Sequence, residues 1–134
     1  MNRILISWLA ALLPFVFILP SASAQQTVER WGCYEISLPA SVPGNPFDVA
    51  LTATFTCGGQ SLTVRGFYDG DDVFKVRFMP PAEGRWTYVT ASKVPALNRK
   101  RGAFDCTAPG SDNHGPVVPD GLHFRYADGT RYYP

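Results

Sequence analysis

The sequence predicts an all-β protein: an immunoglobulin-like antiparallel β-sandwich of about seven strands, ending in a C-terminal hairpin. Three observations lead to this prediction. Short segments alternate between apolar and polar residues, turns rich in glycine and proline separate them, and no stretch after the N-terminal one has a helical period. We expect one domain, because the roughly 110 residues that follow the N-terminal segment bury enough surface for a single core.

The N-terminal segment predicts a secretory signal peptide. Arg3 precedes an apolar run over residues 4–19, and small residues close the segment. A basic start, an apolar middle and an Ala-x-Ala end direct export, so we expect cleavage after Ala24. A membrane anchor is the alternative, but the run contains Pro14 and is short for a span of about 20 residues. The mature chain is expected in the periplasm or outside the cell, with no membrane contact after cleavage.

The clearest strand is predicted over residues 47–55. Phe47, Leu51 and Phe55 share the face that we expect to be buried, while Thr52 and Thr54 face solvent. The other predicted strands are residues 27–38, 61–67, 73–78, 85–90, 103–106, 122–126 and 130–133.

A polar turn is predicted over residues 68–72, before the strand over residues 73–78. Gly70 can adopt positive φ, and Asp69, Asp71 and Asp72 can cap backbone N–H groups. The three carboxylates could instead collect around Ca²⁺. The full calcium-loop pattern is missing, which favours a capped turn.

The C-terminal part is predicted to be a linker and a hairpin. Residues 107–119 are dense in Pro, Gly, Ser, Asp and Asn, and Asp128-Gly129 lies between two alternating runs. We therefore divide the chain into a signal peptide (1–24), a sandwich domain (25–108) and a linker with a hairpin (109–134). The apolar end, Tyr132-Tyr133-Pro134, indicates that the hairpin leads towards a further domain.

Cysteine usage leaves the disulfide pattern open. Cys33, Cys57 and Cys106 are odd in number, so at most one internal bridge forms among three possible pairs. Cys33–Cys106 is favoured if the first and last strands of the sandwich lie side by side. The alternative is three buried thiols without a bridge. No Cys-x-x-Cys spacing occurs, which argues against zinc.

Charge and motifs exclude several classes of protein. The chain has 12 Lys and Arg and 11 Asp and Glu, and without Arg3 the two counts are equal. No basic field for nucleic acid is therefore expected. His114 and His123 lie in no nucleophile motif, and no phosphate-binding glycine loop occurs. We expect no catalytic residue, metal or cofactor. An acid–base pair among Glu29, Glu35, Glu83 and the three aspartates has no pattern to support it.

Aromatic side chains are the candidates for binding. Trp31, Tyr68 and Trp86 could offer flat faces to sugar rings. The alternative is that these large aromatic residues belong to the core, as most do in a small sandwich.

Three stretches together resemble a known family, the domain of unknown function 5060 (DUF5060). They are NPFDVALTATF, GFYDGDDVFKVRFMPPAEGRWTY, and NHGPV followed by HFRYADGTRYYP. The resemblance implies an immunoglobulin-like sandwich at the N-terminus of bacterial glycoside-hydrolase-like proteins. The resemblance also implies that these proteins contain a β/α-barrel and are apiosidase-like. It implies that the barrel and its carboxylates would follow Pro134.

Three functions are then open. The first is a non-catalytic accessory module whose partner is a downstream catalytic barrel in cis. The second is a stand-alone carbohydrate-binding module with a polysaccharide as partner. The third is an adhesion module of the periplasm or the cell surface.

Overall fold

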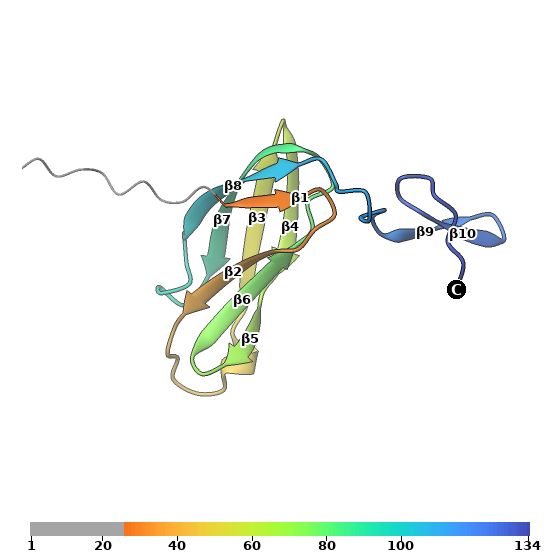
Figure 1. Ribbon diagram of the computed structural model, residues 1–134. Coiled ribbons are helices and arrows are strands. Elements are labelled where there is room, and N and C mark those ends of the chain that lie inside the picture. The colour runs from red at the N-terminus through yellow and green to blue at the C-terminus, as the bar shows by residue number, and fades with distance from the viewer. Residues whose placement is uncertain (1–25) are drawn as a thin grey trace, which may run out of the picture.

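The computed structural model describes residues 26–134, so the predicted signal peptide and its cleavage site at Ala24 lie outside the described residues. Two facing sheets form a sandwich, and a separate two-stranded hairpin follows it (Figure 1). The all-β sandwich with a C-terminal hairpin is confirmed. The elements are β1 (Thr27–Glu29), β2 (Tyr34–Pro39), η1 (Pro46–Asp48), β3 (Leu51–Cys57), β4 (Gln60–Arg65), β5 (Phe67–Gly70), β6 (Val73–Phe78), β7 (Gly84–Ser92), β8 (Arg101–Thr107), β9 (Val117–Asp120) and β10 (His123–Tyr126).

The two sheets divide eight strands between them. One has the order β1-β8-β7-β3-β4 and the other has the order β2-β6-β5. All pairs within them are antiparallel except β1 with β8, which run parallel with Val28 beside Cys106. The first and last strands of the sandwich therefore lie side by side.

The predicted first strand is two strands in different sheets. Residues 27–38 break after β1, where Trp31 has a φ of 66° and the N–H of Gly32 donates to the carbonyl of Glu29 at 2.9 Å. A left-handed residue turns the chain sharply and ends the extended conformation. This turn carries the chain from the five-stranded sheet to the three-stranded one.

The start of the clearest strand was predicted too early. β3 begins at Leu51, and residues 46–48 form the short 3₁₀ helix η1. Asn45 caps this helix: its side-chain oxygen accepts from the N–H of Phe47 at 3.2 Å. A helical turn has no period of two, so Phe47 points outward instead of into the core, and the prediction for this residue was wrong.

The polar turn is shorter than predicted. β5 continues to Gly70, and the turn consists of Asp71 and Asp72, which have φ values of 48° and 56°. Two central residues with positive φ form the type I′ turn, whose twist suits a β-hairpin. The backbone N–H of Asp72 donates to the hydroxyl of Tyr68 at 3.3 Å.

Stacked aromatic pairs join the two sheets. Tyr34 of β2 stacks on Phe104 of β8 with ring centroids 3.9 Å apart, and Phe78 of β6 stacks on Phe55 of β3 at 4.0 Å. Trp86 of β7 meets Phe78 edge to face at 5.0 Å. Offset and edge contacts of this kind add to the stability gained by burial.

The C-terminal hairpin forms one turn earlier than predicted. β10 pairs with β9 around Gly121 and Leu122, not with residues 130–133. Gly121 has a φ of 61°, which allows this tight turn. The predicted Asp128-Gly129 turn is present, and its two sides pair at a single bridge between Arg125 and Arg131.

Candidate interdomain interface

The linker between β8 and β9 is fastened to the sandwich by one carboxylate. Glu29, the last residue of β1, accepts hydrogen bonds from the backbone N–H of Gly110 and the side-chain amide of Asn113, both at 3.1 Å. The same amide donates to the carbonyl of Arg30 at 3.0 Å. The Gly110 bond first, and the Asn113 bond second, lower the pKa of Glu29. The linker is thus held against the end of β1.

Trp31 packs on the same linker. Its backbone N–H donates to the carbonyl of Pro80 at 2.9 Å, and the guanidinium of Arg30 lies 4.2 Å from the centre of its ring. A Cβ atom at Gly115 would come within 2.5 Å of this ring, so only glycine allows the approach. Trp31 is half-buried at this junction, where its ring joins the sandwich to the linker.

A His–Asp pair connects the linker to the C-terminal arm, by which we mean residues 117–134. Nδ1 of His114 lies 2.7 Å from the carboxylate of Asp128, and the N–H of Asp128 donates to the carbonyl of His114 at 3.3 Å. The N–H of Thr130 donates to the other carboxylate oxygen at 2.8 Å. The Thr130 bond and then the His114 contact lower the pKa of Asp128. Side-chain contacts therefore hold the arm to the linker.

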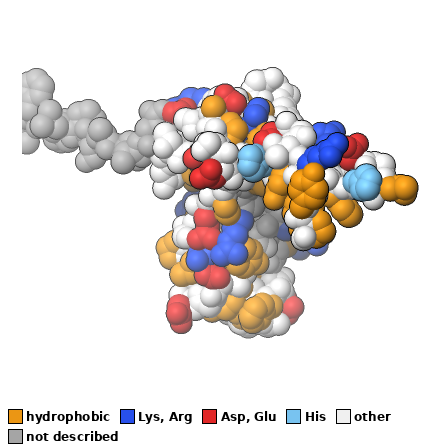
Figure 2. All heavy atoms as spheres, turned by 45° about the vertical axis from the view of Figure 1, so that its right-hand side comes forward, with side chains coloured by type: hydrophobic (Ala, Val, Ile, Leu, Met, Phe, Trp, Pro, Cys, Tyr) orange, Lys and Arg blue, Asp and Glu red, His pale blue; other side chains and the backbone are white. Residues whose placement is uncertain are grey.

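The arm presents large apolar side chains to solvent. Leu122 is 98% exposed and Tyr133 is 76% exposed, and Phe124 and Val117 are also exposed. A hollow of about 590 Å³ lies beside Leu122, Phe124 and Tyr133. Figure 2 shows hydrophobic side chains gathered on this arm. An exposed apolar surface with a polar rim is typical of an interface with another domain or protein.

The other two aromatic candidates lie elsewhere. Trp86 has no exposed surface, and its indole N–H donates to the carbonyl of Ala82 at 2.9 Å, so its ring is unavailable to a sugar. This corrects the expectation for Trp86. Tyr68 is half-buried at the far end of the sandwich, where it contacts Phe47 and Phe74.

The predicted Cys33–Cys106 disulfide is not formed in the structure, where Cys33, Cys57 and Cys106 are free thiols. β1 does lie beside β8, but Cys33 follows the break after β1 and is exposed, whereas Cys106 is buried. Burial is the main reason that the pKa of Cys106 is raised. Cys57 lies close to Gly84, the residue that pairs with Cys106.

Of the carboxylates considered for acid–base chemistry, Glu35 and Asp69 meet at one lysine, Lys75. Glu35 lies in an ion-pair network with Lys75 at 3.2 Å and Arg77 at 2.7 Å, and the Arg77 bond is the main cause that lowers its pKa. Glu83 pairs with Arg30 at 3.4 Å. Asp69 joins the network through Lys75 at 2.7 Å, while Asp71 and Asp72 form the turn after β5.

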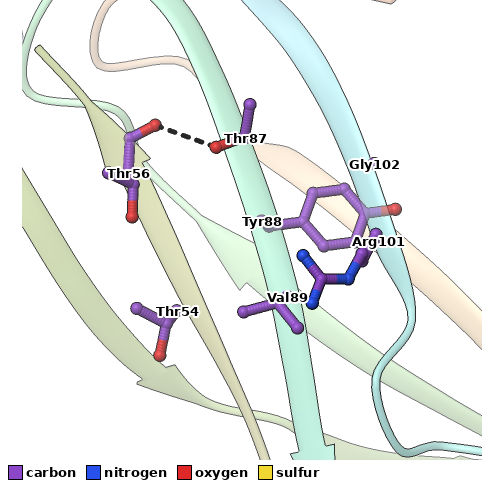
Figure 3. Close-up of a pocket in the computed structure, with 7 residues that line it drawn as sticks. All are labelled: Thr54, Thr56, Thr87, Tyr88, Val89, Arg101 and Gly102. Atoms are coloured by element: carbon purple, nitrogen blue, oxygen red, sulfur yellow. Dashed lines mark hydrogen bonds between the residues drawn. The ribbon is translucent and has the colours of Figure 1, made fainter.

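A shallow hollow of about 570 Å³ opens over β3, β7 and β8 (Figure 3). The hydroxyl of Thr87 donates to the carbonyl of Thr56 at 3.5 Å within it. None of its seven lining residues is a carboxylate, so it does not hold the paired acids that sugar hydrolysis uses. The lining residues are Thr54, Thr56, Thr87, Tyr88, Val89, Arg101 and Gly102.

Within residues 26–134, no group of three or more His, Cys, Asp or Glu side chains lies close enough to hold a metal ion. No helix in the same residues has the length and apolar character needed to cross a membrane.

Sequence reasoning missed the junction and most of the apolar arm. Asn113 and Glu29 are 84 residues apart, and no local pattern connects them. One signal was available at the arm. An apolar residue, Leu122, directly follows Gly121 in a tight turn, a position where polar residues are usual.

We expect the hold of Glu29 on the linker to depend on pH. Its folded-state pKa is lowered from the ordinary value of 4.5, so the ionised carboxylate stabilises the junction fully above that value. The stabilisation is lost as the pH falls through the lowered folded-state pKa. Protection of the Gly110 amide from hydrogen exchange, measured by NMR, should fall over this acid range. Glu29→Gln should reduce the protection at neutral pH and remove its dependence on pH.

Glu35→Gln provides the control. The pKa of Glu35 is also lowered, but this residue lies on the three-stranded sheet, away from Gly110. The variant should leave the protection of the Gly110 amide unchanged. Equal protection at all pH values in the wild-type chain would contradict the role given to Glu29.

Comparison with known proteins identifies the family. A family model described as "Domain of unknown function (DUF5060)" matches residues 27–93, which is half of the 134-residue chain. The chain belongs to the DUF5060 family. The resemblance drawn from the sequence is thereby confirmed. A search of the curated proteins gave no match for this DUF5060 chain.

A solved structure extends the comparison beyond residue 93. The DUF5060 chain is similar to a "putative glycoside hydrolase" from Bacteroides vulgatus, with 51% sequence identity and a TM-score of 0.79. The match covers 82% of this chain and 22% of the Bacteroides vulgatus chain. The DUF5060 chain thus resembles a part, about a fifth, of a larger protein.

Proposed function

We propose that this DUF5060 chain is a non-catalytic accessory module of an exported glycoside-hydrolase-like protein. In this proposal the sandwich (25–108) is a support, and the linker and hairpin (109–134) pack on a catalytic β/α-barrel in cis. The observation that carries the proposal is the exposed apolar surface formed by Leu122, Phe124 and Tyr133 on the C-terminal arm. The match to 22% of a larger chain supports it.

Burial of the arm would supply the energy for docking. Covering a Leu, Phe or Tyr side chain fully contributes about 1.5–3 kcal/mol. The junction limits what docking must order, because Glu29 and Trp31 already hold the linker against the sandwich. A prearranged surface loses less conformational entropy on binding. The sandwich would thus position the barrel instead of being joined to it by a flexible tether.

The test begins with the coding sequence beyond Pro134. If it encodes a barrel, that domain and this chain are produced separately and mixed, and their association is measured by calorimetry. We expect Leu122→Ser with Tyr133→Ser to weaken association at least tenfold. Phe67→Ala, which removes a partly exposed aromatic ring from β5, is the matched control and should have no effect. A stop codon after Pro134, together with a stable, soluble product, would contradict the proposal.

Export is tested at the N-terminus. Production of the full chain in a bacterial host should yield a periplasmic or secreted form that begins at Gln25, because cleavage is expected after Ala24. Mass spectrometry of the intact protein measures this directly. Replacing both Ala22 and Ala24 with a large residue should leave the uncleaved chain with the membrane fraction. A mature protein that retains residues 1–24 would show that the segment is not a cleaved signal.

A second candidate function is a carbohydrate-binding module in its own right. The specific observation that favours it is an exposed aromatic residue, Phe47, at the end of the sandwich away from the arm.

A further inference from the structure

We propose that Phe47 and Tyr68, with the carboxylates around them, bind the chain of a neutral polysaccharide. The site lies where η1 meets β5, at the end of the sandwich opposite to the linker that leads to β9 (Figure 1). The proposal deepens the proposed function and rests on it for the choice of a sugar ligand. It adds that the module holds the polysaccharide on which a carbohydrate-active partner would act.

Phe47 is the aromatic residue whose exposure has no explanation in the fold. It is 74% exposed, although burying a phenylalanine contributes about 1.5–3 kcal/mol. The two other most exposed apolar residues, Leu122 and Tyr133, belong to the C-terminal arm, for which an interface is already proposed. Phe47 lies on a different surface from the C-terminal arm, and we infer a different ligand for it.

The backbone holds Phe47 in one place. The side-chain oxygen of Asn45 accepts from the N–H of Phe47 at 3.2 Å, and its amide donates to the carboxylate of Asp48 at 3.1 Å. The N–H of Val49 closes the helical turn on the carbonyl of Pro46 at 3.3 Å. An aromatic ring on an ordered turn binds with a smaller loss of conformational entropy than a ring on a mobile loop.

Tyr68 supports the ring of Phe47. The two rings meet edge to face, with centroids 5.3 Å apart and planes at 85°. Tyr68 is in turn fixed by Phe74 of the core at 5.2 Å and by the N–H of Asp72, which donates to its hydroxyl at 3.3 Å. Because Phe47 is 74% exposed, its supported ring offers an apolar surface to solvent. The C–H groups of a pyranose ring present a surface of the same kind.

Polar groups beside the rings suit sugar hydroxyls. Asp48, Asp71 and Asp72 are exposed, and none of the ion pairs formed within residues 26–134 involves them. Their carboxylates can therefore accept hydrogen bonds from hydroxyl groups. A surface that combines an apolar face with a few placed polar groups favours an oriented ligand. The negative charge favours a neutral polysaccharide over one that carries uronate or sulfate.

The site and the arm can work at the same time. The hairpin β9–β10 and the turn of η1 extend from different ends of the molecule (Figure 1). A polysaccharide on Phe47 would leave the apolar surface of the arm free for a catalytic domain. This arrangement would keep the polymer near the enzyme without blocking the contact between the two domains.

Affinity electrophoresis of the mature chain tests the site. The gels contain hydroxyethyl cellulose, xyloglucan or arabinoxylan as neutral probes and polygalacturonate as the anionic probe. We expect at least one neutral polymer to retard the chain, and polygalacturonate to retard it less. Phe47→Ala should weaken the binding at least tenfold, whereas Phe47→Trp should preserve it. Phe67→Ala is the matched control, because this ring lies on the same strand as Tyr68 and is 38% exposed.

The outcomes separate this site from the proposed function. No retardation by any neutral polymer, or equal retardation of wild type and Phe47→Ala, would overturn the site. Stronger retardation by polygalacturonate would overturn it too. Leu122→Ser with Tyr133→Ser should leave retardation unchanged even though it weakens domain association. If association with the barrel fails while retardation by a neutral polymer depends on Phe47, the site stands and the accessory role falls. Thermal unfolding of each variant checks that Phe47→Ala is folded.

Discussion

Replacing Trp86 with alanine is expected to lower the free energy of unfolding by about 3–5 kcal/mol. The indole is fully buried, meets Phe78 edge to face and donates its N–H to the carbonyl of Ala82. Its removal opens a large cavity in the core and leaves that carbonyl without its indole donor. Both effects destabilise the folded state and leave the unfolded state almost unchanged.

Urea denaturation followed by far-ultraviolet circular dichroism measures this loss, since tryptophan fluorescence changes with the substitution itself. Trp86→Phe keeps most of the apolar volume and should cost clearly less than the alanine variant. Thr87→Ala, on the exposed face of the same strand, should change stability by less than about 0.5 kcal/mol. A loss below about 1 kcal/mol for Trp86→Ala would contradict the position of Trp86 in the core.

Replacing Gly115 with alanine is expected to open the junction between the sandwich and the C-terminal arm. Gly115 has a φ of 78°, and a Cβ atom there would lie 2.5 Å from the ring of Trp31. Backbone strain and overpacking together should destabilise the closed junction by about 2–4 kcal/mol. The core of the sandwich is separate from the junction, so the free energy of unfolding of the sandwich should change little. The amide of Asn113 donates within the linker, and the amide of Asp128 donates from the arm to the linker. Hydrogen exchange at both amides should accelerate at least tenfold.

A double-mutant cycle separates the two causes. Gly121→Ala has the same kind of strain, with a φ of 61°, but no atom lies within 4 Å of its new methyl group. It should cost only about 1 kcal/mol at its own turn and leave the junction closed. In a Trp31→Ala background, Gly115→Ala should lose the overpacking part of its effect. Equal effects of Gly115→Ala with and without Trp31 would show that the ring does not close the junction.

Much of the sandwich followed from alternation along the strands. Phe74, Val76 and Phe78 are buried as expected, and so are Ala53 and Phe55. A strand places alternate side chains on one face, so the buried residues of a central strand can be read without knowing its neighbours. The family could also be recognised, because its motifs are local stretches of sequence.

At two turns, the prediction from alternation was wrong. The pattern of residues 47–55 placed Phe47 inside, but the cap of Asn45 and the ring of Pro46 start a helical turn that ends the alternation. Residues 27–38 read as one strand, but Trp31 adopts positive φ, which a non-glycine residue does rarely. The backbone N–H of Trp31 donates to the carbonyl of Pro80, which lies in the loop between β6 and β7.

The aromatic candidates show most directly that burial cannot be predicted from local sequence alone. The residue types alone selected Trp31, Tyr68 and Trp86, but the three side chains have different positions in the structure. Trp31 lies at the junction, Tyr68 supports the ring of Phe47, and Trp86 lies in the core. The most exposed ring at the far end, Phe47, was assigned to the core. Whether a ring is buried depends on which residues the opposite sheet brings above it, and this information is not local.

The sequence by itself determined the all-β class, the inward faces of the central strands and membership of the DUF5060 family. Each of these depends on periodicity, turn residues or contiguous motifs, which neighbouring residues in the chain establish. Only the tertiary structure decided which sheet each strand joins, how Glu29 and Trp31 hold the linker, and which apolar side chains remain exposed on the arm and on η1. These depend on contacts between residues far apart in the chain, formed where the packing of the two sheets brings them together.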